Sequence, residues 1–209
     1  VACGPSDGDS SGMPPPPGVR AGTPCLRDPT RPGDRLVNGL IHTLLSDYAS
    51  VRGVDLPEDA MFEQHPDAST IARVARIAEL VGSSEVEVLR DFGSRFPELV
   101  RGRGYGSVLA AMGPSYTAFL GQLDAMHAGL SVSFPGVQMP SFSLESADEA
   151  RCTLLYRSIR GSLTPLAVGI LEGSARLFEL TVDVVVERRR LDGAVPIVIV
   201  RGSAGGRWR

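Results

Sequence analysis

Apolar residues recur every three or four positions along much of this chain, which is the spacing of an amphipathic helix. Two of these stretches also carry start signals, a capping box in one and a Thr-Pro pair in the other. The predicted helices are Leu36 to Ala49, Ser69 to Val81, a segment opened by Ser84 and Glu87, a segment begun by Pro114, and Thr164 to Phe178.

The last part of the chain favours strands instead. Runs rich in β-branched and other apolar residues predict strands at Arg151 to Ile159, Leu180 to Glu187 and Val195 to Arg201. Asp192-Gly193 between the last two is a hairpin signal. The order of elements predicts an α+β fold, in which a helical N-terminal subdomain is followed by a small antiparallel sheet packed with two helices.

Composition divides the chain into one domain and two ends. Residues 1–34 are rich in Pro, Gly, Ser and Asp and contain few large apolar side chains, so we expect a disordered tail. Residues 35–202 are long enough to form one domain with a core and a cofactor pocket. We expect residues 203–209 to be a flexible C-terminus.

Charge and cysteine content restrict the class of protein. The net charge of −3, with acids and bases interspersed, argues against binding to nucleic acid or to a membrane surface. No apolar run reaches membrane-spanning length. Three cysteines suit neither a disulfide framework nor a zinc site, so a cytoplasmic location is expected. The start Val1-Ala2-Cys3-Gly4 is similar to the end of a lipoprotein signal and leaves lipidation of Cys3 open.

One histidine lies on an apolar helix face. This face comprises Tyr116, Phe119, Leu120, Leu123, His127 and Leu130. An inward imidazole needs a partner for its second nitrogen, and a metal is one candidate; a hydrogen-bonded core histidine is the other. His42 lies off the apolar stripe of its helix and His65 precedes a proline, so we expect both at the surface.

A second polar group follows on a predicted strand. Residues two apart share a strand face, so Tyr156, Ser158 and Arg160 would present two hydroxyls and a guanidinium in a row. Such a row suits carboxylate binding, because arginine can form charge-assisted, bidentate bonds. An exposed strand face with ordinary polar residues is the alternative.

These residues belong to a series of motifs. The series reads Leu123-Asp124-Ala125-Met126-His127, Phe134-Pro135-Gly136, Met139-Pro140-Ser141-Phe142, Tyr156-x-Ser158-x-Arg160 and Val168-Gly169-Ile170-Leu171-Glu172-Gly173. It resembles the haem-nitric oxide/oxygen binding (H-NOX) family, the sensor domain of soluble guanylate cyclase and its bacterial relatives. The resemblance implies haem b between the two subdomains, His127 as the proximal iron ligand and Pro140 pressing on the porphyrin. It further implies a propionate clamp and other haem contacts at Tyr156, Ser158, Arg160, Val37, Phe92, Phe96, Leu123 and Leu166.

The resemblance also implies a function. Oxygen-binding members carry a distal tyrosine at the position of Leu166, so an apolar pocket selecting nitric oxide is expected, with carbon monoxide as a further ligand. The signal would pass to a separate protein such as a histidine kinase or a cyclic-di-nucleotide enzyme, and the domain itself would not be an enzyme. One departure is that the helical subdomain is trimmed around Val51 to Glu63.

Two rival hypotheses remain. The first is a haem-free binding or scaffold domain of the same fold, in which trimming has removed the pocket. The second is an enzyme that uses Ser158, His127 and Asp124 as a catalytic triad, although the serine lacks the flanking glycines of a nucleophile elbow.

Overall fold

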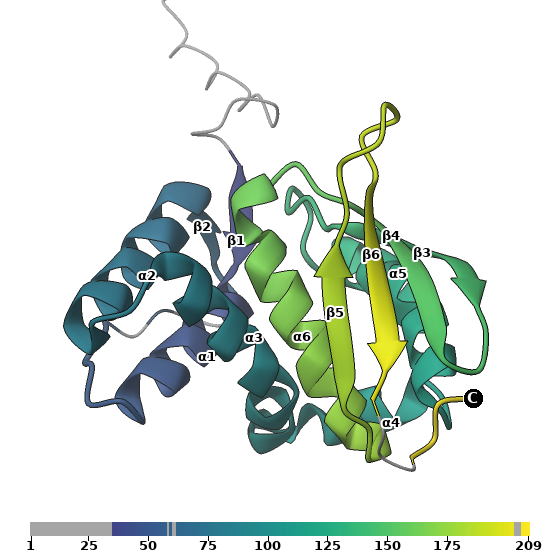
Figure 1. Cartoon of the computed structure of the whole chain (residues 1–209). Helices are drawn as coiled ribbons and strands as arrows, with labels where there is room; N and C mark the ends of the chain where they lie inside the picture. Colours follow the sequence, from purple (N-terminus) through teal and green to yellow (C-terminus); the bar gives the residue numbers. More distant parts are fainter. Residues whose placement is uncertain (1–34, 58, 60–61, 203–205) are drawn as a thin grey trace, which may run out of the picture.

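The computed structural model describes residues 35–57, 59, 62–202 and 206–209. The tail predicted for residues 1–34 lies outside this part of the chain. Helices dominate the first half of the described chain, and all strands of the larger sheet lie in its second half, together with α5 and α6 (Figure 1). The predicted α+β class is therefore confirmed.

Six α-helices are described, with a π-helical turn after the third and single 3-10 turns on either side of the sixth. Their bounds are α1 Gly39–Ser50, α2 Asp67–Val81, α3 Glu85–Val100, the π turn Arg101–Tyr105, α4 Gly106–Ala111, α5 Tyr116–Ser133, the 3-10 turn Gly161–Leu163, α6 Thr164–Ala175 and the 3-10 turn Arg176–Phe178. The capping box at the start of α3 is confirmed, since Glu87 N donates to Ser84 Oγ and Ser84 N donates to Glu87 Oε2.

The strands form two antiparallel sheets. Their bounds are β1 Leu36–Asn38, β2 Gln64–Pro66, β3 Ser141–Ala147, β4 Arg151–Arg157, β5 Val182–Val186 and β6 Val195–Arg201. β1 and β2 pair with each other, and the larger sheet has the order β3-β4-β6-β5. The predicted hairpin between β5 and β6 is confirmed; Gly193 has a positive φ of 81°, which glycine adopts without strain.

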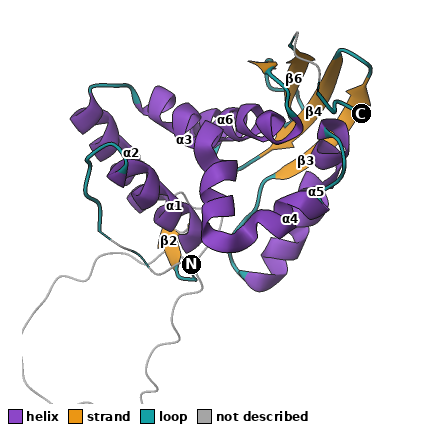
Figure 2. Cartoon of the chain, turned by 90° about the horizontal axis from the view of Figure 1, so that it is seen from below, coloured by secondary structure: helices purple, strands orange, loops and turns teal. Residues whose placement is uncertain are grey.

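Two hydrophobic clusters make up the core. One is built from α1, α2 and α3; the other joins α5, α6 and the larger sheet. In Figure 1, α1 and α2 lie at one end, the sheet at the other, and α3 and α6 between them; Figure 2 shows α5 beside β3. The clusters thus correspond to the helical subdomain and to the sheet with its two helices.

Glycines let the central helices α3 and α6 approach closely. A Cβ added at Gly169 would lie 2.0 Å from the carbonyl oxygen of Arg90, and one at Gly173 would lie 2.2 Å from that of Ser94. No side chain fits at either position without moving the backbone of α3. The crossing that joins the two subdomains is therefore backbone against backbone.

Several predicted element boundaries were wrong. Leu36–Asn38 is a strand rather than the first turn of α1, and the side chain of Asn38 caps that helix by accepting from Leu40 N. β4 ends at Arg157, before the predicted end at Ile159. β3 was not predicted, although Phe142 and Leu144 alternate with polar residues along it.

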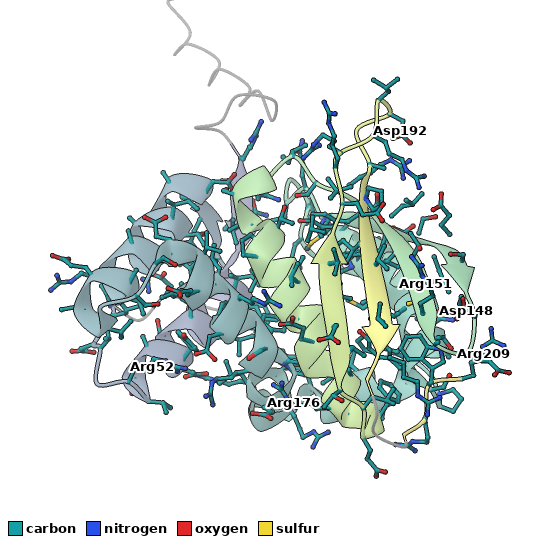
Figure 3. All side chains as sticks on the ribbon, in the orientation of Figure 1. Arg52, Asp148, Arg151, Arg176, Asp192 and Arg209 are labelled. Carbon is teal, nitrogen blue, oxygen red and sulfur yellow. The ribbon has the colours of Figure 1, made fainter. Side chains whose placement is uncertain are left out.

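The C-terminal residues 206–209 pack against the domain, contrary to the expectation of a flexible end. Trp208 is 2% exposed and its indole Nε1 donates to the carbonyl oxygen of Asp148. The first turn of α5 donates to the same segment, from Tyr116 N to Arg207 O and from Thr117 N to Trp208 O. Among the labelled side chains of Figure 3, Asp148, Arg151 and Arg209 gather at this corner. No described helix is long and apolar enough to cross a membrane.

Candidate haem site

His127 lies near the C-terminal end of α5, one turn after the buried Leu123. Its Nδ1 is 2.7 Å from the carbonyl oxygen of Leu123, and a carbonyl only accepts, so Nδ1 carries the proton and donates it. Burial lowers the pKa of His127 below its ordinary value, although the Leu123 bond opposes this. The imidazole is thus neutral with its lone pair on Nε2, the state that ligates iron.

Three rings connect this helix to the sheet. The His127 ring centroid lies 5.2 Å from that of Phe142 on β3, and Phe142 lies 5.2 Å from Tyr156 on β4. Leu123 belongs to the same cluster. Asp124, three residues before His127 on α5, accepts from Phe142 N at 3.0 Å. These contacts fix the end of α5 that carries the histidine against the first two strands.

The predicted clamp residues come together, but not as a row on a strand face. Tyr156 is 4% exposed, and desolvation raises the pKa of its phenol, with a hydrogen bond to Ser158 acting in the opposite direction. Since the strand ends at Arg157, Ser158 and Arg160 lie in the loop that follows. There the hydroxyl of Ser158 accepts from Arg160 N at 3.0 Å.

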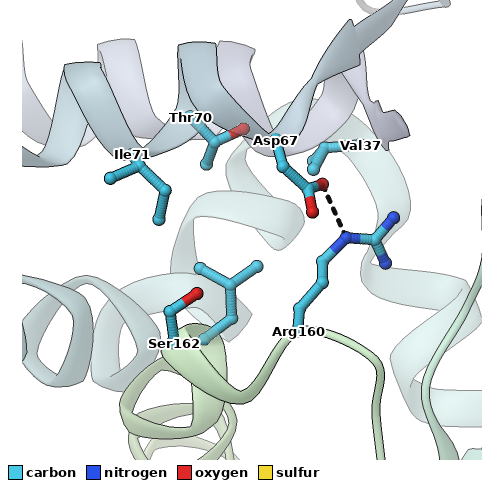
Figure 4. A pocket seen from close by; sticks show the side chains of 7 residues that line it. Val37, Asp67, Thr70, Ile71, Arg160 and Ser162 are labelled. Atoms are coloured by element: carbon cyan, nitrogen blue, oxygen red, sulfur yellow. Dashed lines mark hydrogen bonds and ion pairs between the residues drawn. The ribbon is translucent and has the colours of Figure 1, made fainter. Parts of the chain in front are cut away.

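Arg160 is 8% exposed, and groups of this chain engage each nitrogen of its guanidinium. Its Nε donates to Asp67 Oδ1 at the start of α2 at 2.7 Å, which Figure 4 shows as a dashed line. Its two Nη atoms donate to the carbonyl oxygens of Gln138 and Leu36. Asp67 thus provides a carboxylate of the kind that a clamp arginine recognises. Sequence reasoning missed it.

A small cavity adjoins this ion pair. Val37, Asp67 and Arg160 are among its lining residues (Figure 4), and its volume is about 10 Å³. Pro140 is half-buried and directly precedes β3. Cofactor pockets generally measure roughly 300–1,000 Å³. The donor set therefore fits haem in chemical kind, while accommodating it requires the helices around Arg160 to move apart.

The residues predicted for the distal side belong to the helical core. Phe92 is 1% exposed and makes an edge contact with Tyr48 at 5.3 Å and with Phe96 at 5.9 Å. Leu166 on α6 is buried in the same cluster. The side chains of Phe92, Phe96 and Leu166 carry no hydrogen-bonding group.

The catalytic triad considered above is not assembled. The Asp124 carboxylate bonds to the backbone of Phe142, and Nδ1 of His127 bonds to the backbone of Leu123. The hydroxyl of Ser158 is held by Arg160 N. None of these bonds joins histidine to serine or to aspartate, so the arrangement that activates a serine nucleophile is missing from this geometry.

Comparison with known proteins identifies the family. A family model described as Haem-NO-binding matches residues 42–186, more than half of the chain. The chain belongs to the haem-NO-binding family. Guanylate cyclase soluble subunit beta-2 of Rattus norvegicus is 33% identical over 91 residues, which make up 44% of this chain and 13% of that protein. Soluble guanylate cyclase gcy-33 of Caenorhabditis elegans is 28% identical over 128 residues, 61% of this chain and 14% of that protein.

Solved structures of the family share the fold. An H-NOX protein from K. algicida, in the Fe(II) unliganded state, has a TM-score of 0.67 and 15% identity, covering 80% of this chain and 97% of that one. An H-NOX protein from S. oneidensis, in the Fe(II)NO ligation state, has a TM-score of 0.63 and 16% identity, covering 80% of this chain and all of that one. At these identities the likeness establishes the haem-NO-binding fold and nothing finer.

Proposed function

We propose that this haem-NO-binding domain is a gas sensor that holds haem b between its two subdomains. His127 would ligate the iron, and Tyr156, Ser158 and Arg160 would bind the propionates. The main support is the hydrogen bond that His127 Nδ1 donates to the Leu123 carbonyl oxygen. This bond keeps the proton on Nδ1 and leaves Nε2 free to bind a metal. Once bound, the ferrous haem would supply an open coordination position for a diatomic gas.

The propionate clamp requires a change of partner at Arg160. Its guanidinium is neutralised by Asp67 and held by two backbone carbonyls. A propionate of equal charge can replace the carboxylate without leaving the buried arginine unpaired. We infer that α2, which carries Asp67, moves when the cofactor binds.

The apolar surroundings of Leu166 favour nitric oxide as the ligand. Bound oxygen gains from a hydroxyl donor near its outer atom, whereas nitric oxide does not need one. Leu166 is buried with Phe92 and has no hydrogen-bonding group. Leu166→Tyr is expected to lengthen oxygen retention by the haem-loaded protein, and Leu166→Phe is the matched control for size. Equal oxygen off-rates in the two variants would refute the selectivity argument.

Signalling would pass from α5 to another protein. A change in ligation at His127 would act on the helix whose first turn is bonded to Arg207 and Trp208. We propose as partner a separate signalling protein, a histidine kinase or a cyclic-di-nucleotide enzyme, and a cytoplasmic location. The domain itself would carry no catalysis.

The central test is spectroscopic. Protein loaded with haem and reduced without oxygen is expected to give a five-coordinate ferrous spectrum, to ignore oxygen, and to become a five-coordinate nitrosyl. His127→Gly is expected to lose or alter this spectrum. Failure of the unmodified protein to take up one equivalent of haem would refute the proposal.

That failure would favour a haem-free scaffold of the same fold. This second candidate has its own support, because the cavity beside Arg160 is only about 10 Å³ and the arginine already has a carboxylate partner. A scaffold would keep its melting temperature unchanged when haem is added, whereas a haem protein would be stabilised by mass action.

A further inference from the structure

Two histidines that sequence reasoning placed at the surface form a buried cluster with one aspartate. His42 on α1 is 0% exposed, and His65 on β2 is half-buried. Their rings are stacked, with centroids 4.2 Å apart and planes inclined by 16°. Asp59, in the connection between α1 and β2, completes the group. None of its three residues is among those predicted to contact haem.

The cluster brings together three ligand atoms of the kinds that zinc-like ions prefer. Nδ1 of His42 lies 2.6 Å from Oδ2 of Asp59, and one ligand atom from each residue falls within 4.8 Å of the others. Imidazole nitrogen and carboxylate oxygen bind divalent transition metals at about 2.0–2.2 Å. A tetrahedral ion would therefore separate the two bonded atoms from 2.6 Å to roughly 3.3 Å. Because a nitrogen lone pair lies in the plane of its ring, one of the two stacked imidazoles must also rotate before both can face the ion.

One nitrogen of the cluster is left without a partner. Nε2 of His65 is buried, and no hydrogen bond to it is present. A buried polar atom without a partner costs roughly 1–3 kcal/mol, so native proteins generally satisfy such atoms. A bound ion is one way to satisfy it, and ligand atoms of His42 and Asp59 lie within 4.8 Å of the ligand atom of His65.

Thr70 on α2 would orient His42 for ligation. The hydroxyl of Thr70 lies 2.7 Å from Nε2 of His42 and can either donate or accept. If Nδ1 binds the ion, Nε2 carries the proton and donates it to this hydroxyl, the usual outer contact of a ligating histidine.

The positive charge of Arg73 disfavours a bound cation, but Arg73 has hydrogen-bond partners besides Asp59. It forms an ion pair with Oδ2 of Asp59 at 2.6 Å. It also donates to the carbonyl oxygen of Pro57 at 2.8 Å and to the hydroxyl of Ser46 at 3.2 Å. Arg73 can therefore release the carboxylate and still keep two hydrogen bonds.

We propose that His42, Asp59 and His65 bind one divalent transition-metal ion of the zinc type, with water in the fourth position. The site does not depend on haem. It would join the end of the helical subdomain to β2, where His65 pairs with Val37 on β1. The ion would thereby brace the strand that borders the Arg160 cavity.

Zinc titration of the full-length chain, incubated with one equivalent of haem whether or not it is taken up, tests the site, with the two cysteines before residue 35 replaced by serine in every sample. Calorimetry is expected to show one equivalent of zinc. His65→Ala and Asp59→Asn are each expected to weaken binding by at least about tenfold, since removal even of an outer contact commonly costs that much. Asp55→Asn, in the same connection but outside the cluster, is the matched control and should leave the affinity unchanged.

Zinc-edge X-ray absorption of the unmodified protein keeps the proposal testable if a variant fails to fold. Two imidazole ligands and light-atom ligation are expected. Absence of zinc binding, affinity equal in all four proteins, or a spectrum without imidazole scattering would overturn the proposal. None of these results depends on haem uptake, which is measured separately by the haem absorption of the same samples.

Discussion

Adding a single methyl group at Gly169 is expected to disrupt the crossing of α3 and α6. An alanine Cβ there would lie 2.0 Å from the carbonyl oxygen of Arg90 and 2.9 Å from Ser94 N. These are backbone atoms in the middle of a helix, so no side-chain rotation relieves the contact. The nearest distance must grow to about 3.4 Å, the lower end of ordinary contact, which moves one helix away from the other.

Two opposing terms set the size of the effect. Overpacking typically costs about 1–3 kcal/mol, and a rigid backbone neighbour places Gly169→Ala at the upper end. Alanine regains about 1 kcal/mol through its higher helix propensity. The net loss should be about 2 kcal/mol, which for a domain of this size lowers the melting temperature by about 4–8 °C. Thermal unfolding followed by circular dichroism measures it.

Gly121→Ala is the matched control for this variant. Gly121 lies inside α5, and a Cβ added there meets no atom within 4 Å. The same chemical change is therefore expected to stabilise the protein by up to about 1 kcal/mol. If Gly169→Ala proves as stable as the unmodified protein, or if both variants move in the same direction, the close backbone crossing is not as described.

Three other perturbations have defined outcomes. Asp67→Asn removes the carboxylate that neutralises the buried Arg160. It should lower the unfolding free energy of the haem-free protein, measured in urea, by about 1–3 kcal/mol. An unchanged unfolding free energy would mean that the pair is solvated. Burial raises the pKa of the Cys152 thiol to about 12. In a variant whose other two cysteines are replaced by serine, maleimide at pH 8 should therefore label only the unfolded protein. Rapid labelling of the native protein would contradict this. Hydrogen bonds from Ser84 hold the pKa of Glu87 at about 2, so the stability it adds is complete above about pH 5 and lost as the pH falls towards 2. The stability difference between Glu87→Gln and the parent should shrink over that range, and a constant difference would refute the cap.

Local patterns were sufficient for much of the fold. Helical spacing located the helices, the Ser84–Glu87 pair marked the start of α3, and Asp192-Gly193 marked the hairpin, because each signal acts over a few residues. The pairing of β1 with β2 was missed, since two three-residue strands leave too short a pattern to recognise.

The candidate site was predictable where its residues form a motif. His127, Tyr156, Ser158 and Arg160 were singled out in this way, and the structure brings the last three together. Asp67 could not be found, because a side chain paired with an arginine 93 residues away looks like any acidic residue in the first turn of a helix. The partners of His42 were missed for the same reason, since burial of a polar residue is decided by distant parts of the chain.

The anchored C-terminal segment has a practical use, because Trp208 is the only tryptophan of the chain. Its indole is buried against Tyr116 at the start of α5, with ring centroids 5.7 Å apart. Intrinsic fluorescence of the unlabelled protein therefore reports on a single place, the junction between the first turn of α5 and the segment 206–209. Stopped-flow emission after gas is added would time the arrival of a structural change at that junction without any introduced dye.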